Sequence, residues 1–125
     1  MDKEQLILIV DDEMDICDML VLMLEYHGYK ATAAPDQETA LHILSSTPVA
    51  LIIMDVLLSG SKGTDLCLQL KQDPATSSIP VLMFSALSQS KHDCMAAGAD
   101  DFIAKPFELK EIMAKVDLFM RRKTV

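Results

Sequence analysis

The chain has 125 residues, half of them hydrophobic, which suits one compact domain and excludes extensive disorder. Its formal net charge of −8 argues against direct binding to nucleic acid or to an anionic membrane, because both favour basic surfaces. No apolar stretch approaches the roughly 20 residues of a membrane-spanning helix, and the N-terminal residues lack the apolar region of a signal peptide. The three cysteines are scattered without metal-binding spacing, so we expect free thiols in a cytoplasmic protein.

Strand and helix signals alternate along the first half of the chain. Short apolar runs rich in isoleucine and valine are typical of parallel strands that are buried on both faces. Between these runs, apolar residues recur at helical spacing; Gly28 ends the first helix, and Asp36 is a good N-cap for the second. The predicted order is a strand over 6–10, a helix over about 13–27, a strand over 29–33, a helix over 36–45 and a strand over 49–55.

The second half continues this alternation. The predicted elements are a helix over 64–71, a strand over 81–84 that ends at Ser85, a weaker helix over 91–97, a strand over 101–104 and a helix over 108–122. Five strand–helix repeats predict an α/β fold with a parallel sheet, although the pattern alone leaves the strand order open. Because no linker or repeat interrupts the chain, we expect a single domain over residues 1–125, with its core over about 5–122.

Charged residues follow three of the predicted strands. Asp11 and Asp12 follow the first strand, Asp55 ends the third, and Lys105 follows the last. Since the carboxyl ends of parallel strands meet at one edge of a sheet, these side chains are expected to lie together. Three carboxylates facing one lysine make a poor structural ion pair but a plausible seat for a divalent cation and a phosphoryl group.

An aspartate at such a site can attack phosphorus and form an aspartyl phosphate. Because the attacking carboxylate is negative, a cation is needed, and magnesium requires only one or two carboxylates from the protein. Asp12 and Asp55 are candidate ligands, Asp11 is a candidate partner for a metal-bound water, and Lys105 and Ser85 can contact phosphoryl oxygens. Each residue also has an ordinary interpretation, such as acids at a helix N-terminus or a lysine in a surface turn.

Together, these segments resemble the response-regulator receiver domain, the phosphoacceptor module of two-component signalling. The resemblance covers the chain from Leu6 to about Arg122, and its motifs are specific in their order and spacing rather than one by one. It implies a doubly wound, flavodoxin-like fold with a five-stranded parallel sheet in the order 2-1-3-4-5 and five helices on two faces. The motifs are Ile9-Val10-Asp11-Asp12-Glu13, Met54-Asp55-Val56, Ser85-Ala86, Gly98-Ala99-Asp100-Asp101-Phe102 and Lys105-Pro106-Phe107.

The resemblance assigns a role to each candidate residue. It implies that Asp55 is the phosphoacceptor, and that Ser85 and Lys105 bind the phosphoryl group. Mg²⁺ is then held by Asp12, Asp55, the backbone carbonyl of Leu57 and, through water, Asp11. Lys105-Pro106 is expected to be a cis peptide. Phe102 occupies the place of the aromatic switch residue that moves inward with Ser85, and as a phenylalanine it has no hydroxyl group to bond.

Some residues around the expected site depart from the family pattern. Leu57 and Leu87 stand where relatives often carry polar side chains, and Ser59 and Lys62 replace a common proline and aspartate in the loop after Asp55. Two leucines cannot orient an attacking water, so we expect a slowly hydrolysing phosphorylated form.

Two surfaces are candidate interfaces. Asp15, Asp18, Val21 and Leu22 are expected on the exposed face of the first helix, where the family docks its phosphodonor, a sensor histidine kinase or a phosphotransfer protein. The last strand and helices resemble the charged face through which some regulators form homodimers, the alternative being an ordinary solvated surface. The charged residues concerned are Lys91, Asp100, Asp101, Glu111, Lys115 and Arg121.

The interpretation that follows is a phosphorylation-switched module that assists its own phosphorylation and dephosphorylation and is not an enzyme for an external substrate. A haloacid-dehalogenase-type phosphotransferase would need a second aspartate two residues after Asp55, where this chain has Leu57. A flavodoxin-like electron carrier would need a phosphate-binding loop after the first strand, and no such loop of serine, threonine and glycine follows it in this sequence. A receiver-like binding module that works without phosphorylation is the remaining alternative.

Overall fold

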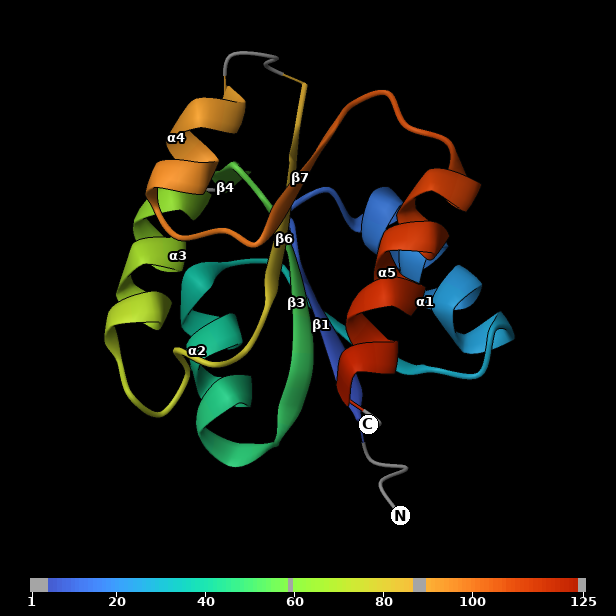
Figure 1. Ribbon diagram of the computed structural model, residues 1–125, viewed down its shortest axis with the longest axis horizontal. Coiled ribbons are helices and arrows are strands. Elements are labelled where there is room, and N and C mark those ends of the chain that lie inside the picture. Colours follow the sequence, from blue (N-terminus) through green and yellow to red (C-terminus); the bar gives the residue numbers. More distant parts are fainter. Residues whose placement is uncertain (1–4, 59, 87–89, 124–125) are drawn as a thin grey trace.

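The computed structural model describes residues 5–58, 60–86 and 90–123. Its main sheet has five parallel strands in the order β2-β1-β3-β6-β7, which confirms the predicted order 2-1-3-4-5 (Figure 1). The strands are β1 (Leu6–Val10), β2 (Lys30–Ala34), β3 (Val49–Asp55), β6 (Val81–Ser85) and β7 (Asp101–Ala104). The sequence-based bounds of these strands are therefore right to within one residue.

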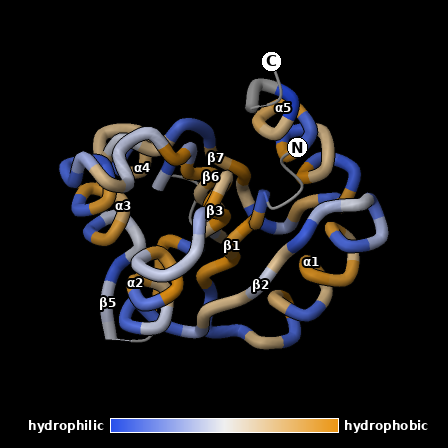
Figure 2. The backbone as a smooth tube through the Cα atoms, turned by 90° about the horizontal axis from the view of Figure 1, so that it is seen from below, coloured by the Kyte–Doolittle hydropathy of each residue, from blue (hydrophilic) through white to orange (hydrophobic). Residues whose placement is uncertain are grey.

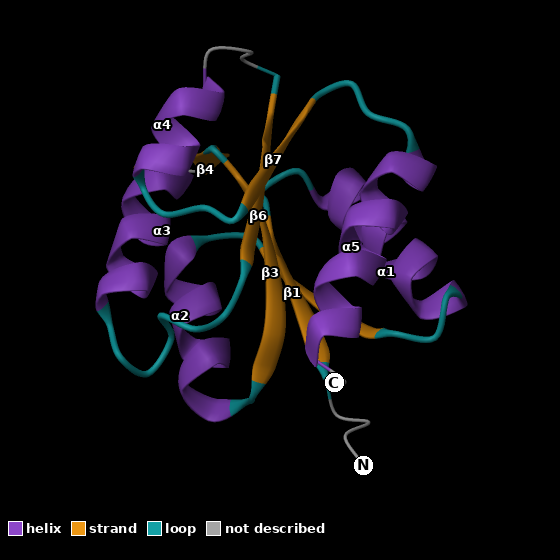
Figure 3. Cartoon of the chain, viewed as in Figure 1, coloured by secondary structure: helices purple, strands orange, loops and turns teal. Residues whose placement is uncertain are grey.

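Helices cover both faces of the sheet, as the doubly wound fold requires. Figure 3 shows α1 and α5 together on one face and α2, α3 and α4 on the other. The helices are α1 (Met14–Tyr26), α2 (Gln37–Ser46), α3 (Gly63–Gln72), α4 (Ser90–Ala96) and α5 (Leu109–Lys123). Asp36 is the predicted N-cap of α2, and its Oδ1 accepts a hydrogen bond of 2.8 Å from the backbone N–H of Thr39.

The central strands are apolar because both of their faces are buried. Along β1, Ile7 and Ile9 pack with α1 and α5, while Leu8 and Val10 pack with the helices of the opposite face. The same alternation holds along β3 and gives the apolar centre of Figure 2. A continuous apolar run therefore predicts a central strand of this sheet better than strict alternation would.

Two short elements were missed by the sequence analysis. A two-residue antiparallel ladder joins β4 (Leu57–Leu58) to β5 (Ser61–Lys62), directly after the strand that carries Asp55. Gly63 then opens α3 so close to β3 that a Cβ atom would overlap the carbonyl oxygen of Asp55. Glycine is thus required here by close approach, and it fixes the start of α3 beneath the candidate site.

The three cysteines are buried free thiols, as expected. Burial raises the pKa of each thiol to about 11, which makes all three poor nucleophiles at neutral pH. Among the described residues, no helix is long and apolar enough to cross a membrane.

Candidate functional site

The carboxyl ends of four strands lie at one edge of the sheet, towards the top of Figure 1, and residues at these ends line an acidic pocket. Its volume is about 380 Å³. The residues that line it are Asp12, Glu13, Asp55, Leu57, Leu58, Ser85, Ala86 and Lys105. The structure therefore brings together side chains that lie up to about 90 residues apart in the chain, as the parallel sheet predicts.

Asp55 ends β3 and lies at the floor of this pocket. Asp55 as a whole is 8% exposed, and each of its two carboxylate oxygens accepts a hydrogen bond. The backbone N–H of Leu57 donates to Oδ1 over 3.3 Å, and Lys105 Nζ donates to Oδ2 over 3.1 Å. These contacts hold the carboxylate in one orientation that faces the pocket.

Lys105 connects several parts of the site. Its Nζ also donates to Glu13 Oε1 over 3.3 Å and lies 4.8 Å from the ring centre of Phe84. Burial acts to lower the pKa of this lysine, but the hydrogen bond and charge of Asp55, together with Asp11 and Glu13, raise it overall. The side chain is therefore a fixed positive charge at neutral pH. The predicted cis peptide between Lys105 and Pro106 is confirmed.

Asp11 is completely buried behind the pocket. Its Oδ1 accepts a hydrogen bond of 3.0 Å from the backbone N–H of Glu13, whereas its Oδ2 has no hydrogen-bond partner among the described residues. Burial and then the nearby charge of Asp55 raise the pKa of Asp11 from 3.8 to about 6. A buried carboxylate oxygen without a partner is costly, and a bound cation or a cation's water would satisfy it.

Three carboxylates converge at this point. Oxygens of Asp11, Glu13 and Asp55 lie within 4.8 Å of one another, a spacing and donor set that suit a hard divalent cation. Asp12 is exposed and lines the same pocket, but Glu13 is the residue whose oxygen joins this close group. The sequence analysis overlooked Glu13 as a site residue, although it is the third acid in a row after β1.

The two expected switch residues lie on neighbouring strands. Ser85 is buried at the end of β6, where it lines the pocket and donates a hydrogen bond of 3.4 Å to Ser90 Oγ. Phe102 in β7 is half-buried against the apolar cluster beneath α2, α3 and α4. Leu57 is 56% exposed at the pocket rim, whereas Leu87 and Ser59 lie outside the described residues.

The two predicted interfaces differ from expectation in detail. On α1, Asp15, Asp18 and Leu22 are exposed as predicted. Val21 is instead half-buried, because it lies on the helix next to Cys17 and Leu24, which face the core. On the face of β7 and α5, the structure pairs three of the expected charged residues, Asp100, Asp101 and Lys115, within the chain. Lys115 Nζ lies 2.7 Å from Asp101 Oδ2, and Lys71 Nζ lies 2.9 Å from Asp100 Oδ2.

Comparison with known proteins identifies this arrangement. The profile of the response regulator receiver domain matches residues 7–117. The phosphate regulon transcriptional regulatory protein PhoB of Pseudomonas aeruginosa is 36% identical over 118 residues, which are 93% of this chain but 52% of PhoB. The chain thus spans about half the length of this curated relative.

Solved structures give the same result. The receiver domain of a signal transduction histidine kinase from Syntrophus aciditrophicus has a TM-score of 0.87 and 34% identity, over 94% of this chain and 90% of that one. The response regulator TrrA from Thermotoga maritima, solved in complex with Mg(2+)-BeF, has a TM-score of 0.83 and 27% identity, over 92% and 98%. The chain belongs to the response regulator receiver domain family, the phosphorylation-switched modules of two-component signalling.

Proposed function

We propose that this receiver domain accepts a phosphoryl group on Asp55 from the phosphohistidine of a sensor histidine kinase or a phosphotransfer protein. The observation that carries the proposal is the partly buried ion pair of Asp55 and Lys105 beside Asp11 Oδ2, which has no hydrogen-bond partner among the described residues. The proposed unit is a single receiver domain over residues 1–125 in the cytoplasm. Its activity is confined to assisting its own phosphorylation and dephosphorylation.

In the proposed transfer, an Asp55 oxygen forms a bond to phosphorus while the bond from phosphorus to the donor's imidazole nitrogen breaks. The imidazole leaves with the electron pair of that bond and becomes neutral as it takes a proton from solvent. Lys105 Nζ, already 3.1 Å from Asp55 Oδ2, is placed to balance the negative charge on a phosphoryl oxygen. Ser85 Oγ lines the same pocket and can donate to another phosphoryl oxygen.

The proposed metal is Mg²⁺, whose charge, when it is bound, offsets the carboxylates and the phosphoryl oxygens. Candidate ligands are Asp12, Asp55 and the backbone carbonyl of Leu57, with Asp11 bonded to a metal water. The fit rests on the close group of Asp11, Glu13 and Asp55, and on Asp11 Oδ2, which no described residue hydrogen-bonds. The relative TrrA was solved in complex with Mg(2+)-BeF, which supports Mg²⁺ as the metal.

Reversal and signalling depend on neighbouring residues. Leu57 presents an exposed apolar side chain at the pocket rim, so it offers no group to orient a hydrolytic water; this supports a long-lived phosphorylated form. Ser85 and Phe102 are the proposed switch pair, and because Phe102 has no hydroxyl group, its movement changes packing alone. The exposed part of α1, with Asp15 and Asp18, is the proposed docking face for the phosphodonor.

A homodimer through the last strand and helices has weaker support than the sequence suggested. Asp100 and Asp101 are already paired with Lys71 and Lys115 of the same chain, so they contribute less to an intermolecular contact.

The test is incubation with acetyl phosphate and Mg²⁺, followed by measurement of the intact mass. We expect a magnesium-dependent gain of one phosphoryl group that is lost in Asp55→Asn and retained in Asp65→Asn, a matched change of an exposed aspartate on α3. Absence of any gain, with small-molecule and phosphohistidine donors alike, would instead favour a binding module that works without phosphorylation.

A further inference from the structure

Glu13 occupies the first position of α1 but does not serve that helix. It is the N-cap residue, a position that favours serine, threonine, aspartate or asparagine. Within the described chain, its side chain accepts no capping hydrogen bond from the first turn of α1. It reaches instead to Lys105, whose Nζ donates to Glu13 Oε1 over 3.3 Å. A residue that departs from a local preference in this way is expected to serve a functional site.

The backbone of Glu13 is held firmly, whereas its side chain lies at the mouth of the acidic pocket. Its N–H donates to Asp11 Oδ1 over 3.0 Å, and its carbonyl oxygen accepts hydrogen bonds of 3.1 Å from the N–H groups of Ile16 and Cys17. The side chain is 60% exposed, so the ion pair with Lys105 rather than burial holds its carboxylate in place. This pair connects the start of α1 to the segment after β7, 92 residues away along the chain.

Lys105 is shared between two carboxylates. Its Nζ lies 3.1 Å from Asp55 Oδ2 and 3.3 Å from Glu13 Oε1, so two of its three N–H donors are occupied. In the proposed transfer, this ammonium group balances the charge on a phosphoryl oxygen. The carboxylate of Glu13 already offsets part of that charge before the phosphoryl group arrives. Nζ can then follow a phosphoryl oxygen only if its contact with Glu13 lengthens or breaks.

We propose that Glu13 is a positioning residue that restrains Lys105 and thereby slows the phosphorylation of Asp55. The inference rests on the proposed function, because it concerns the same transfer. The ion pair stabilises the resting site more than the site in which Lys105 contacts a phosphoryl oxygen, so it raises the barrier. Glu13 forms no bond to phosphorus, and its loss changes the rate of the reaction but not the product.

A role as a metal ligand is the alternative for Glu13. One of its oxygens lies within 4.8 Å of oxygens of Asp11 and Asp55, which is compatible with a shared cation. The two roles predict opposite effects at saturating Mg²⁺. Loss of a ligand slows phosphorylation, whereas loss of the restraint on Lys105 accelerates it. The ion pair with Lys105 is the contact that the structure shows, and it favours the restraint.

The first test compares phosphorylation rates. Glu13→Gln keeps the shape of the side chain and removes its charge, so acetyl phosphate at saturating Mg²⁺ should phosphorylate this variant at least about fivefold faster than the unmodified protein. Intact mass followed over time measures the rate. Glu25→Gln, the same change at an exposed position near the end of α1, is the matched control and should leave the rate unchanged.

A shorter acid separates the restraint from simple repulsion of the donor. Glu13→Asp keeps the negative charge, but its side chain is one methylene shorter and suits the N-cap of α1. If Glu13 acts through Lys105, the shorter side chain releases the lysine, and Glu13→Asp should be phosphorylated at least about threefold faster than the unmodified protein. If repulsion by charge alone slows the reaction, the rate should not change.

The second test needs neither metal nor phosphoryl donor. Urea unfolding of Glu13→Ala, Lys105→Met and the double variant forms a cycle that isolates the interaction of the two side chains. We expect a coupling of at least about threefold in the equilibrium constant of unfolding, a modest value because the side chain of Glu13 is mostly exposed. Effects of the two changes that simply add would overturn the proposed ion pair.

The rate measurements separate failure of this inference from failure of the proposed function. Phosphorylation of the unmodified protein without acceleration in Glu13→Gln would overturn the inference alone, and slower phosphorylation of this variant would assign Glu13 to the metal. A rate in Glu13→Asp equal to that of the unmodified protein would overturn the action through Lys105. If neither the unmodified protein nor Glu13→Gln gained a phosphoryl group, the proposed function would fail and this inference with it.

Discussion

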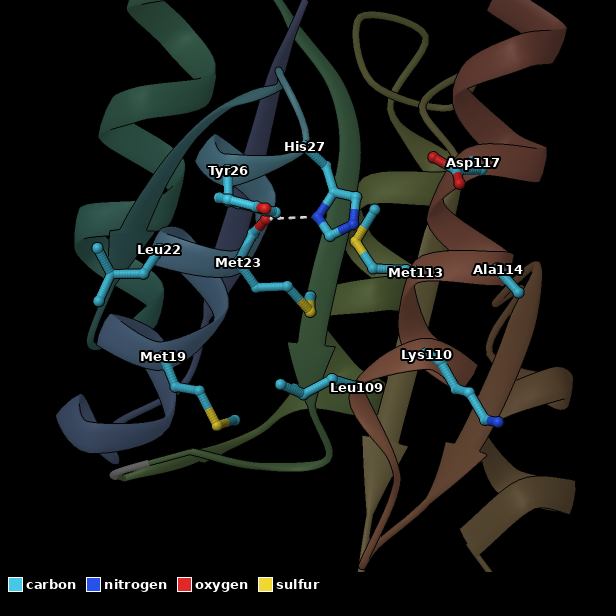
Figure 4. A pocket seen from close by; sticks show the side chains of 10 residues that line it. All are labelled: Met19, Leu22, Met23, Tyr26, His27, Leu109, Lys110, Met113, Ala114 and Asp117. Atoms are coloured by element: carbon cyan, nitrogen blue, oxygen red, sulfur yellow. Dashed lines mark hydrogen bonds between the residues drawn. The ribbon is translucent and has the colours of Figure 1, made fainter.

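The acidic pocket and an apolar groove between α1 and α5 depart in opposite ways from the usual pattern of buried apolar and exposed charged groups. Met19, Leu22, Tyr26 and Leu109 are the exposed apolar residues that line this groove (Figure 4). At the pocket, Asp11 and Asp55 bury charge, and one oxygen of Asp11 has no hydrogen-bond partner in the part of the chain that the structure describes. In the groove, Leu22 and Tyr26 expose apolar surface on a helix whose other side is well packed. Buried charge without full compensation costs stability and is typical of reacting or ion-binding sites, whereas exposed apolar surface is typical of protein contacts. The two regions therefore indicate chemistry and association respectively.

The largest expected effect tests whether the groove serves binding rather than stability. Leu20 is fully buried on α1, and Leu22, two residues along, is 69% exposed. Leu20→Ala should lower the free energy of unfolding by about 3 kcal/mol, because it removes apolar contacts and leaves a cavity. Leu22→Ala should change it by less than about 0.5 kcal/mol. Urea unfolding measures both, and a large loss in Leu22→Ala would show that the groove belongs to the folded core.

The next effect tests the cost of the buried acid. The folded state raises the pKa of Asp11 to about 6, so it binds a proton more tightly than the unfolded chain does. Stability from this group is present below the unfolded pKa of about 4 and is lost as the pH rises through about 6. Without magnesium, the unmodified protein should thus lose about 2 to 3 kcal/mol relative to Asp11→Asn over this range.

Urea unfolding between pH 4 and pH 7 measures this difference, and Asp65→Asn is the control for an exposed carboxylate. Added magnesium at pH 7 should stabilise the unmodified protein more than Asp11→Asn, because ligand binding favours the folded state. Parallel pH curves for the two proteins would mean that Asp11 is not the costly acid.

The sequence predicted the pocket better than it predicted the groove, for a physical reason. Strand ends in a parallel sheet converge whatever the helices do, so Asp11, Asp55 and Lys105 could be placed together from apolar runs alone. Whether Glu13 turns towards Asp55 depends on the entry of α1, which no local pattern specifies. The groove depends on the packing of two helices that are about 90 residues apart, and the β4–β5 ladder is too short for a periodic signal.

A smaller effect concerns the pocket rim, where exposed apolar surface lies beside buried charge. Leu57 is an exposed apolar side chain at the edge of a polar site. Leu57→Asn supplies a group that can orient water, so we expect the phosphorylated form to lose its phosphoryl group about tenfold faster, a change of about 1.4 kcal/mol in the barrier. Intact mass followed over time measures the lifetime. An unchanged lifetime in both Leu57→Asn and Leu87→Asn would contradict the proposed shielding.

The smallest effect lies at the far end of the groove, where one polar contact helps to hold α5 in place. The hydroxyl group of Tyr29 donates a hydrogen bond of 2.6 Å to Asp117 Oδ1, and burial together with this contact raises the pKa of Tyr29 to about 12. Tyr29→Phe removes the bond but keeps the ring, so the free energy of unfolding should fall by about 1 kcal/mol. Urea unfolding measures this loss, and an unchanged free energy of unfolding in Tyr29→Phe would show that the hydrogen bond does not stabilise the position of α5.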